Sequence, residues 1–107
     1  DLKMGKYKIL VSESYHRDLR AIISYIANDI DAPFAAHDFL DNIEKIVSSL
    51  SHMPYRYNLV DDPYLQHKEF RKCIIKNYII FYKVHEESKT VMIHRMLHTR
   101  QNWIDIL

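Results

Sequence analysis

The chain opens with a period of two in its polar and apolar positions and then changes to a helical period. Residues 6–11, KYKILV, alternate and are β-prone, which predicts a first strand. Ser12 follows as the expected N-cap of a helix that runs to about residues 28–30. A second helix is predicted from Pro33 to about residue 50, with Pro33 at a first helical position, where its missing N–H is tolerated. Both helices carry an apolar stripe at 3.6-residue spacing, so both are expected to face a core.

The period returns to two in the last third of the chain. Strands are predicted at 69–75, 78–84 and 90–97, joined by a hairpin turn at 76–77 and a polar turn at 85–89. The connection between the two helices is short, which favours an antiparallel helical hairpin. We therefore predict an α+β fold of two layers, in which the N-terminal strand and the hairpin pack on an antiparallel sheet.

Residues 51–67, SHMPYRYNLVDDPYLQH, have no regular period. Two prolines and the acidic pair Asp61-Asp62 mark turns, and adjacent acids before a proline are read as turn formers rather than catalytic carboxylates. Three tyrosines and Leu59 predict that this segment lies against the sheet.

Strict alternation along strand 90–97 assigns its side chains to two faces. One face would carry Met92, His94, Met96 and His98, and the other Val91, Ile93, Arg95 and Leu97. Since both faces contain apolar groups, the face away from the helices is expected to expose apolar surface to a protein partner.

The length of 107 residues predicts a single domain spanning the whole chain. One glycine argues against phosphate-binding glycine loops, and one cysteine, Cys73, excludes an intrachain disulfide. Cys73 lies in an apolar strand and is expected to be a buried, inert thiol. No apolar run is long enough to span a membrane, and a cytoplasmic location is expected. Met4 is expected to be the natural start, with residues 1–3 left by cloning.

The net charge of +1 hides an asymmetry. Residues 1–63 carry seven Lys/Arg and ten Asp/Glu, a difference of −3, whereas residues 64–107 carry eight and four, a difference of +4. The basic half is either solvated surface or a face for an anionic partner.

Candidate chemistry is confined to this basic half. His94 and His98 would lie about 13 Å apart on one strand, too far to share a metal ion, and neither a metal nor a cofactor is expected. The remaining candidates are cations with one histidine and one tryptophan: Lys68, Arg71, Lys72, Arg95, His98, Arg100 and Trp103. The cations would polarise a phosphodiester with His98 as general acid or base, or they decorate the surface, with Arg95 paired to a carboxylate.

Three segments in this order resemble the RelE/ParE superfamily of bacterial toxins. They are YKILVSESYHRDLRAIISYI, FRKCIIKNYIIFYKV and HRMLHTRQNWIDIL, and together they cover most of the chain. The resemblance implies the toxin of a type II toxin–antitoxin module, acting in the cytoplasm and neutralised by a cognate antitoxin that wraps it. RelE-like members of the superfamily cleave mRNA on the ribosome without a metal, and ParE-like members poison DNA gyrase.

Individual positions favour the ParE-like branch. RelE-like nucleases carry a pattern like Tyr-Arg-Leu-Val-Tyr in the third strand, and this chain has Ile79 in place of the arginine. They also carry a pair of basic residues on the second strand; Lys72 matches one of these positions, but Phe70 occupies the other. An isoleucine cannot stabilise phosphate charge. The tail resembles the ParE-like pattern Leu-His-x-Arg-x-Asp, with Asn102 in place of the acid.

The resemblance leads to three hypotheses. The first is a ParE-like toxin that binds a target such as gyrase; the second is a RelE-like mRNA endonuclease; the third is an interaction domain without toxicity. The catalytic residues of a nuclease would be His98, Arg100, Arg71 and Lys72. Target binding is assigned to Arg95, Arg100 and Trp103, and antitoxin binding to Met92, His94 and Met96.

Overall fold

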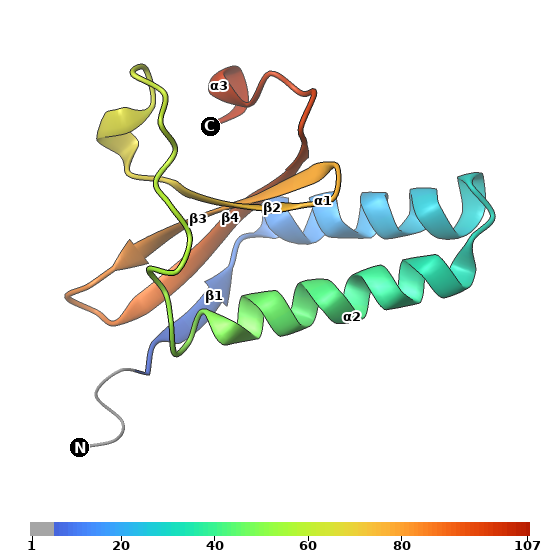
Figure 1. Ribbon diagram of the computed structural model, residues 1–107, viewed down its shortest axis with the longest axis horizontal. Helices are drawn as coiled ribbons and strands as arrows, with labels where there is room; N and C mark the ends of the chain where they lie inside the picture. Colours follow the sequence, from blue (N-terminus) through green and yellow to red (C-terminus); the bar gives the residue numbers. More distant parts are fainter. Residues whose placement is uncertain (1–5) are drawn as a thin grey trace.

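A computed structural model describes residues 6–107, and the expected start at Met4 lies outside the described residues. The elements follow in the predicted order, with an additional short helix at each end of the last third (Figure 1). They are β1 (Lys8–Val11), α1 (Glu13–Ser24), the π-helical turn η1 (Tyr25–Asp29), α2 (Pro33–Ser49), the 3-10 turn η2 (Gln66–Lys68), β2 (Arg71–Ile75), β3 (Tyr78–His85), β4 (Thr90–His98) and α3 (Trp103–Ile106). The predicted α+β fold is confirmed.

The four strands form one sheet in the order β1-β4-β3-β2. The hairpins β2–β3 and β3–β4 are antiparallel, but β1 pairs with β4 in parallel, so the sheet is mixed rather than wholly antiparallel. The helical hairpin carries the chain from β1 at one edge of the sheet to β2 at the other edge, and the two antiparallel hairpins then bring β4 beside β1. In the turn between β2 and β3, Lys76 adopts a positive φ of 55°.

Ser12 joins the first strand to the first helix as predicted. Its Oγ accepts a hydrogen bond from the Tyr15 N–H at 2.9 Å, which satisfies one of the free N–H groups of the first turn. The same hydroxyl donates to the His94 carbonyl at 2.6 Å, and the Ser12 N–H donates to the Ile93 carbonyl at 2.9 Å. The cap therefore also fixes the start of α1 against the edge of β4.

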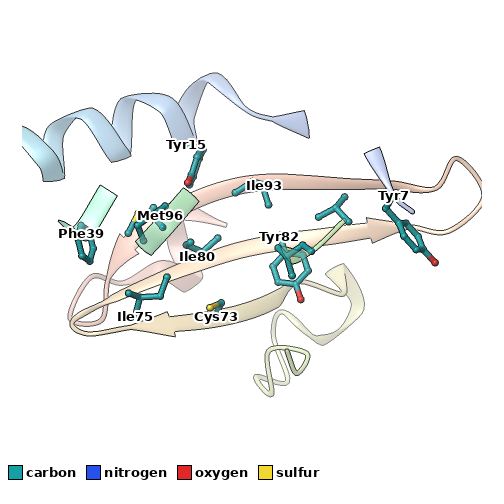
Figure 2. Close-up of a cluster of buried hydrophobic side chains, with 12 residues drawn as sticks. Tyr7, Tyr15, Phe39, Cys73, Ile75, Ile80, Tyr82, Ile93 and Met96 are labelled. Atoms are coloured by element: carbon teal, nitrogen blue, oxygen red, sulfur yellow. The ribbon is translucent and has the colours of Figure 1, made fainter. Parts of the chain in front are cut away.

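The main core lies between the helical hairpin and one face of the sheet (Figure 2). Its buried residues are Tyr7, Tyr15, Phe39, Ile43, Leu50, Cys73, Ile75, Ile80, Tyr82, Val91, Ile93 and Met96. The predicted burial of the Cys73 thiol is confirmed. The hairpin tip departs from the prediction, because Ile30 is 54% exposed although its spacing assigns it to the core stripe.

A second apolar cluster covers part of the opposite face of the sheet. The segment after α2 crosses to that face and α3 packs there too, so this face is not simply open (Figure 1). The cluster contains Val60, Leu65, Phe70, Ile79, Phe81 and Leu97, with Trp103, Ile104 and Leu107 packed against it. We call it the outer cluster. The prediction that residues 51–67 lie against the sheet is confirmed, since Leu59 forms a bridge with Arg71 at the edge of β2.

A β-bulge in β4 changes which side chains share a face. Phe81 lies opposite Arg95 and its neighbour Tyr82 lies opposite Ile93, so His94 is the extra residue. Beyond the bulge the alternation is inverted. The prediction that Met96 shares a face with Met92 is therefore wrong.

The bulge also separates residues that alternation had placed together. Met96 lies with Ile93 in the main core, whereas Leu97 lies in the outer cluster rather than beside Val91. The apolar residues of β4 thus pack in both the main core and the outer cluster, and strict alternation along the strand does not predict this distribution.

Candidate functional site

The two basic residues of β2 lie on opposite faces of the sheet. Arg71 lies opposite Tyr82, a residue of the main core, and Lys72 lies opposite Phe81 of the outer cluster. The Arg71 guanidinium donates to the Tyr57 carbonyl at 2.7 Å and stacks over the Tyr55 ring at 4.7 Å. Arg71 therefore holds the irregular segment against the sheet edge.

His98 and Arg100 lie together at the far end of the sheet. The Arg100 N–H donates to His98 Nδ1 at 3.0 Å, and the His98 ring meets the Tyr78 ring edge-on with centroids 5.4 Å apart. Because Nδ1 accepts this bond, the proton of a neutral His98 belongs on Nε2. The Arg100 side chain is exposed and makes no hydrogen bond or ion pair with residues 6–107.

These four residues do not form one site. His98 on β4 lies across the sheet from Ile75 on β2, two strands or about 10 Å to the side. Arg71 is four residues from Ile75 along β2, about 13 Å, so Arg71 and His98 are far apart in both directions. Lys72 lies on the other face from His98. A general acid and the cations that would hold one phosphate must lie within hydrogen-bond reach of it, and only His98 and Arg100 are neighbours.

Arg95 is held by a carboxylate of α1. Its Nε donates to Asp18 Oδ2 at 2.7 Å and its Nη2 to Asp18 Oδ1 at 2.9 Å, while the Met96 N–H donates to the same Oδ2 at 2.9 Å. The bond to Asp18 raises the pKa of Arg95, so the guanidinium stays charged. The Asp18 carboxylate accepts a hydrogen bond from the edge of β4 at a position where a longer β1 would pair with it. The Arg95 guanidinium is engaged in the ion pair with Asp18.

Trp103 and Ile79 both belong to the outer cluster. Trp103 stacks on Phe81 with ring centroids 5.5 Å apart and an interplanar angle of 35°. Ile79, the position of the missing nuclease arginine, is 4% exposed beside them. Packing therefore accounts for Trp103, and its contact with Phe81 holds α3 against the sheet.

The three residues assigned to antitoxin binding are placed differently. Met96 is 1% exposed and lies between the sheet and the helices, near Phe39 in Figure 2, because the bulge turns it inward. Its predicted location on the open face is wrong. Met92 and His94 are only partly buried. His94 meets the Phe70 ring edge-on at 5.2 Å, and its Nε2 is buried without a hydrogen-bond partner.

Two features were not predicted from the sequence. Glu86, in the turn after β3, accepts hydrogen bonds from the hydroxyls of Tyr7 and Tyr55 and pairs with Lys89, which lowers its pKa to about 2. The bond from Lys89 makes the largest contribution. No sequence pattern distinguishes Glu86 from its neighbour Glu87.

The second feature is exposed apolar surface at the tip of the helical hairpin. Tyr25, Ile30 and Phe34 are 49%, 54% and 86% exposed. Beside them is a hollow of about 470 Å³ between the hairpin and the β2–β3 turn, with Tyr78 and His98 in its wall. Its sequence signal was Ile30, which continues the apolar stripe of the first helix to the hairpin tip.

Residues 6–107 contain neither a clustered metal site nor a membrane-spanning helix. No group of three or more His, Cys, Asp or Glu side chains is placed to hold a metal ion there. No helix in the same range is long and apolar enough to cross a membrane.

The helical hairpin, the mixed four-stranded sheet and the outer cluster define a small α+β protein. A sequence model of the ParE toxin of the type II toxin–antitoxin system parDE matches residues 9–103. The chain therefore belongs to the ParE toxin family.

Solved structures agree on the fold. A chain of the toxin–antitoxin complex RelBE2 from Mycobacterium tuberculosis has a TM-score of 0.61 and 22% identity, over 90% of this chain and 94% of that one. A chain of the chromosomal ParDE system from P. aeruginosa has a TM-score of 0.68 and 15% identity, over 88% of this chain and 97% of that one. Among curated proteins, no sequence match is found.

Proposed function

We propose that this chain is a toxin that inhibits growth by binding its target rather than by catalysis, with DNA gyrase as the target. The observation that carries the proposal is the dispersal of the candidate catalytic residues. Arg71 is tied to the Tyr57 carbonyl, Lys72 faces the other side, and His98 lies at the opposite end of the sheet.

The packing of the outer face supports the same proposal. A nuclease site would need a phosphate-stabilising cation near Ile79, but that side chain is buried in the outer cluster with Phe81 and Trp103. An apolar cluster at this position gives no charge stabilisation to a transition state. Cleavage of mRNA on the ribosome remains the second candidate, because His98 and Arg100 are neighbours and both are accessible from outside.

Arg100 is the residue that we assign to target binding. Of the three predicted target residues, Arg95 is paired with Asp18 and Trp103 is stacked on Phe81, which leaves Arg100 as the exposed cation. Arg20 on α1 is an exposed arginine on a different element and provides a matched control.

Purified gyrase provides the direct test. The toxin is expected to inhibit supercoiling or to increase cleaved DNA, and Arg100→Ala is expected to weaken this effect while Arg20→Ala is not. Unaltered gyrase activity at excess toxin would refute the gyrase proposal. Primer extension on translated mRNA tests the second candidate, and cut sites that disappear in His98→Ala would establish the nuclease instead.

The proposed partner in the cell is a cognate antitoxin that covers the hairpin tip. Neighbouring exposed apolar side chains such as these commonly mark a protein interface, and the solved relatives RelBE2 and ParDE are named as toxin–antitoxin systems. The apolar face of an antitoxin helix would bury Phe34, Ile30 and Tyr25. Met92 and His94 remain candidates for a second contact on the open part of the outer face.

Size-exclusion chromatography of toxin mixed with its antitoxin tests this assignment. Burying the Phe34 ring is worth about 1.5–3 kcal/mol, so Phe34→Asp is expected to weaken the complex at least roughly tenfold. Ile74→Asp is the control, since Ile74 is 61% exposed and lies on the face of β2 opposite the helices, where it pairs with Ile79 of the outer cluster. An equal loss in both variants would show that the hairpin tip is not the specific contact.

A further inference from the structure

The third strand extends beyond its neighbour at one end of the sheet. β2 begins at Arg71, opposite Tyr82, whereas β3 continues to His85. Before β2 the chain turns away, because Glu69 has a φ of 57° in the left-handed region. Val84 therefore has no strand beside it on the β2 side within residues 6–107.

The hydrogen-bond directions show where the Val84 backbone points. The Lys72 N–H donates to Asn58 and the Phe70 carbonyl accepts from Val60, so alternate residues of β2 point away from β3. Arg71, between them, points toward Tyr82. Peptide groups two residues apart point the same way, so Val84 directs its N–H and carbonyl to the side where β2 is missing. Neither group has a backbone partner there among residues 6–107.

Val84 lines a groove of about 600 Å³. The other lining residues that bear on its ligand are Tyr55, Leu59, Glu69, Arg71, Glu86 and Glu87. Its apolar wall is formed by Tyr55 and Leu59, which are 48% and 46% exposed.

Some charged side chains of the groove are already bound to other groups of the protein, and others are not. Arg71 is held by the Tyr57 carbonyl, and Glu86 is held by two tyrosine hydroxyls and Lys89. Glu69 and Glu87 are exposed and have no ion-pair partner within residues 6–107. The carboxylates that remain available to a ligand therefore favour a basic one.

We propose that this groove binds an extended, basic segment of a partner protein by strand addition to β3. The segment pairs its backbone with the N–H and carbonyl of Val84. One apolar side chain fits between Tyr55 and Leu59, and basic side chains reach Glu69 and Glu87. The groove lies at the other end of β3 from His98 and Arg100, so this proposal does not depend on the identity of the toxin's target.

Nuclear magnetic resonance of the ¹⁵N-labelled full chain tests the proposal. The probe is a five-residue peptide of alternating Lys and Val, blocked at both ends, and its counterpart has Glu in place of Lys. The basic peptide is expected to shift the Val84 amide resonance, to slow its hydrogen exchange, and to bind at least roughly tenfold more tightly than the acidic peptide at low salt. Methylating the central backbone nitrogen of the peptide is expected to abolish the protection of Val84.

Charge-neutral variants complete the test. The double variant Glu69→Gln/Glu87→Gln is expected to bind the basic peptide roughly fivefold more weakly, and Glu44→Gln on α2 is expected to bind it as the parent does. The proposal is overturned by equal binding of the acidic peptide or by an unchanged Val84 amide. It is also overturned by an equal loss in the Glu44 control, or by Val84 shifts that follow protein concentration alone, which would indicate a second copy of the chain as occupant.

Discussion

Replacing Asp18 with Ala is expected to lower the free energy of unfolding by about 3 kcal/mol. The Asp18 carboxylate accepts from Arg95 Nε at 2.7 Å, from Arg95 Nη2 at 2.9 Å and from the Met96 N–H at 2.9 Å. Asp18 links α1 to β4 where β1 has already ended. Its removal leaves a charge and a backbone donor without partners.

The magnitude follows from the burial of the groups left behind. The side chains of Arg95 and Asp18 are 29% and 13% exposed. Breaking a fully buried ion pair costs about 3–5 kcal/mol, and an unsatisfied buried donor costs about 1–3 kcal/mol. Arg95 regains some water because it is partly exposed, so the expected loss lies at the lower end of the first range.

Urea unfolding at neutral pH measures the effect, and two further variants show its origin. Asp18→Asn keeps an acceptor for the Met96 N–H and one bond to Arg95, so about half of the loss is expected. Asp38→Ala, at an exposed position on α2, is expected to change the free energy of unfolding by less than about 0.5 kcal/mol.

A loss below about 1 kcal/mol for Asp18→Ala would refute the reasoning, because it would make the pair equivalent to a surface ion pair. Equal losses for the Ala and Asn variants would show that the loss comes from the charge of Asp18, which both variants lack, and that the hydrogen bonds retained by Asn do not contribute. A double-mutant cycle with Arg95→Ala separates the two contacts, since the Met96 bond survives when only Arg95 is removed.

Three other predictions concern the outer cluster. Trp103→Ala removes the ring that stacks on Phe81 and is expected to cost about 2–3 kcal/mol in urea unfolding, less than a fully buried tryptophan because Trp103 is partly exposed. Ile79→Arg buries a charge at a position that is 4% exposed, so it is expected to cost about 3 kcal/mol or more without producing mRNA cleavage, whereas Ile79→Met is expected to cost less than about 1.5 kcal/mol; cut sites in primer extension with the arginine variant would contradict this. Burial lowers the pKa of His94 below its ordinary value of 6.5, and the nearby Lys83 adds to this, so the stability that neutral His94 contributes is fully present above 6.5 and is lost as the pH falls through the lowered value. The urea midpoint of the parent is therefore expected to fall more between pH 7.5 and 5.5 than that of His94→Gln, and equal slopes would contradict it.

Much of the fold could be predicted because local signals and tertiary contacts agree. Ser12 caps α1 as its position suggested, and Pro33 begins α2. The hairpin turn at 76–77 was also placed correctly. At each of these positions the backbone requirement is met within a few residues of the signal.

The bulge at His94 could not be predicted, because the residues on both sides of it suit either face. Met92 and Met96 are equally acceptable in a core or at a partly covered surface, so their spacing carries no register. The single extra residue inverts the face of the sheet on which each following side chain of β4 lies, and Met96 therefore lies in the main core. The contact of Arg95 was also open, since its partner Asp18 lies 77 residues away in the sequence.

The outer cluster supports the proposal that the basic half of the chain acts by binding rather than by catalysis. Apolar residues on both faces of the strands predicted an open face for a partner, but the chain itself covers part of that face with residues 59–70 and α3. A phosphate-cleaving site would need this face to be polar and accessible, and here it is packed around Phe81 and Ile79. Two of the arginines lie at opposite ends of the sheet, Arg100 beyond the end of β4 and Arg71 at the start of β2. Separated charges of this kind can contact a large partner at several points, but they cannot act together on one scissile bond.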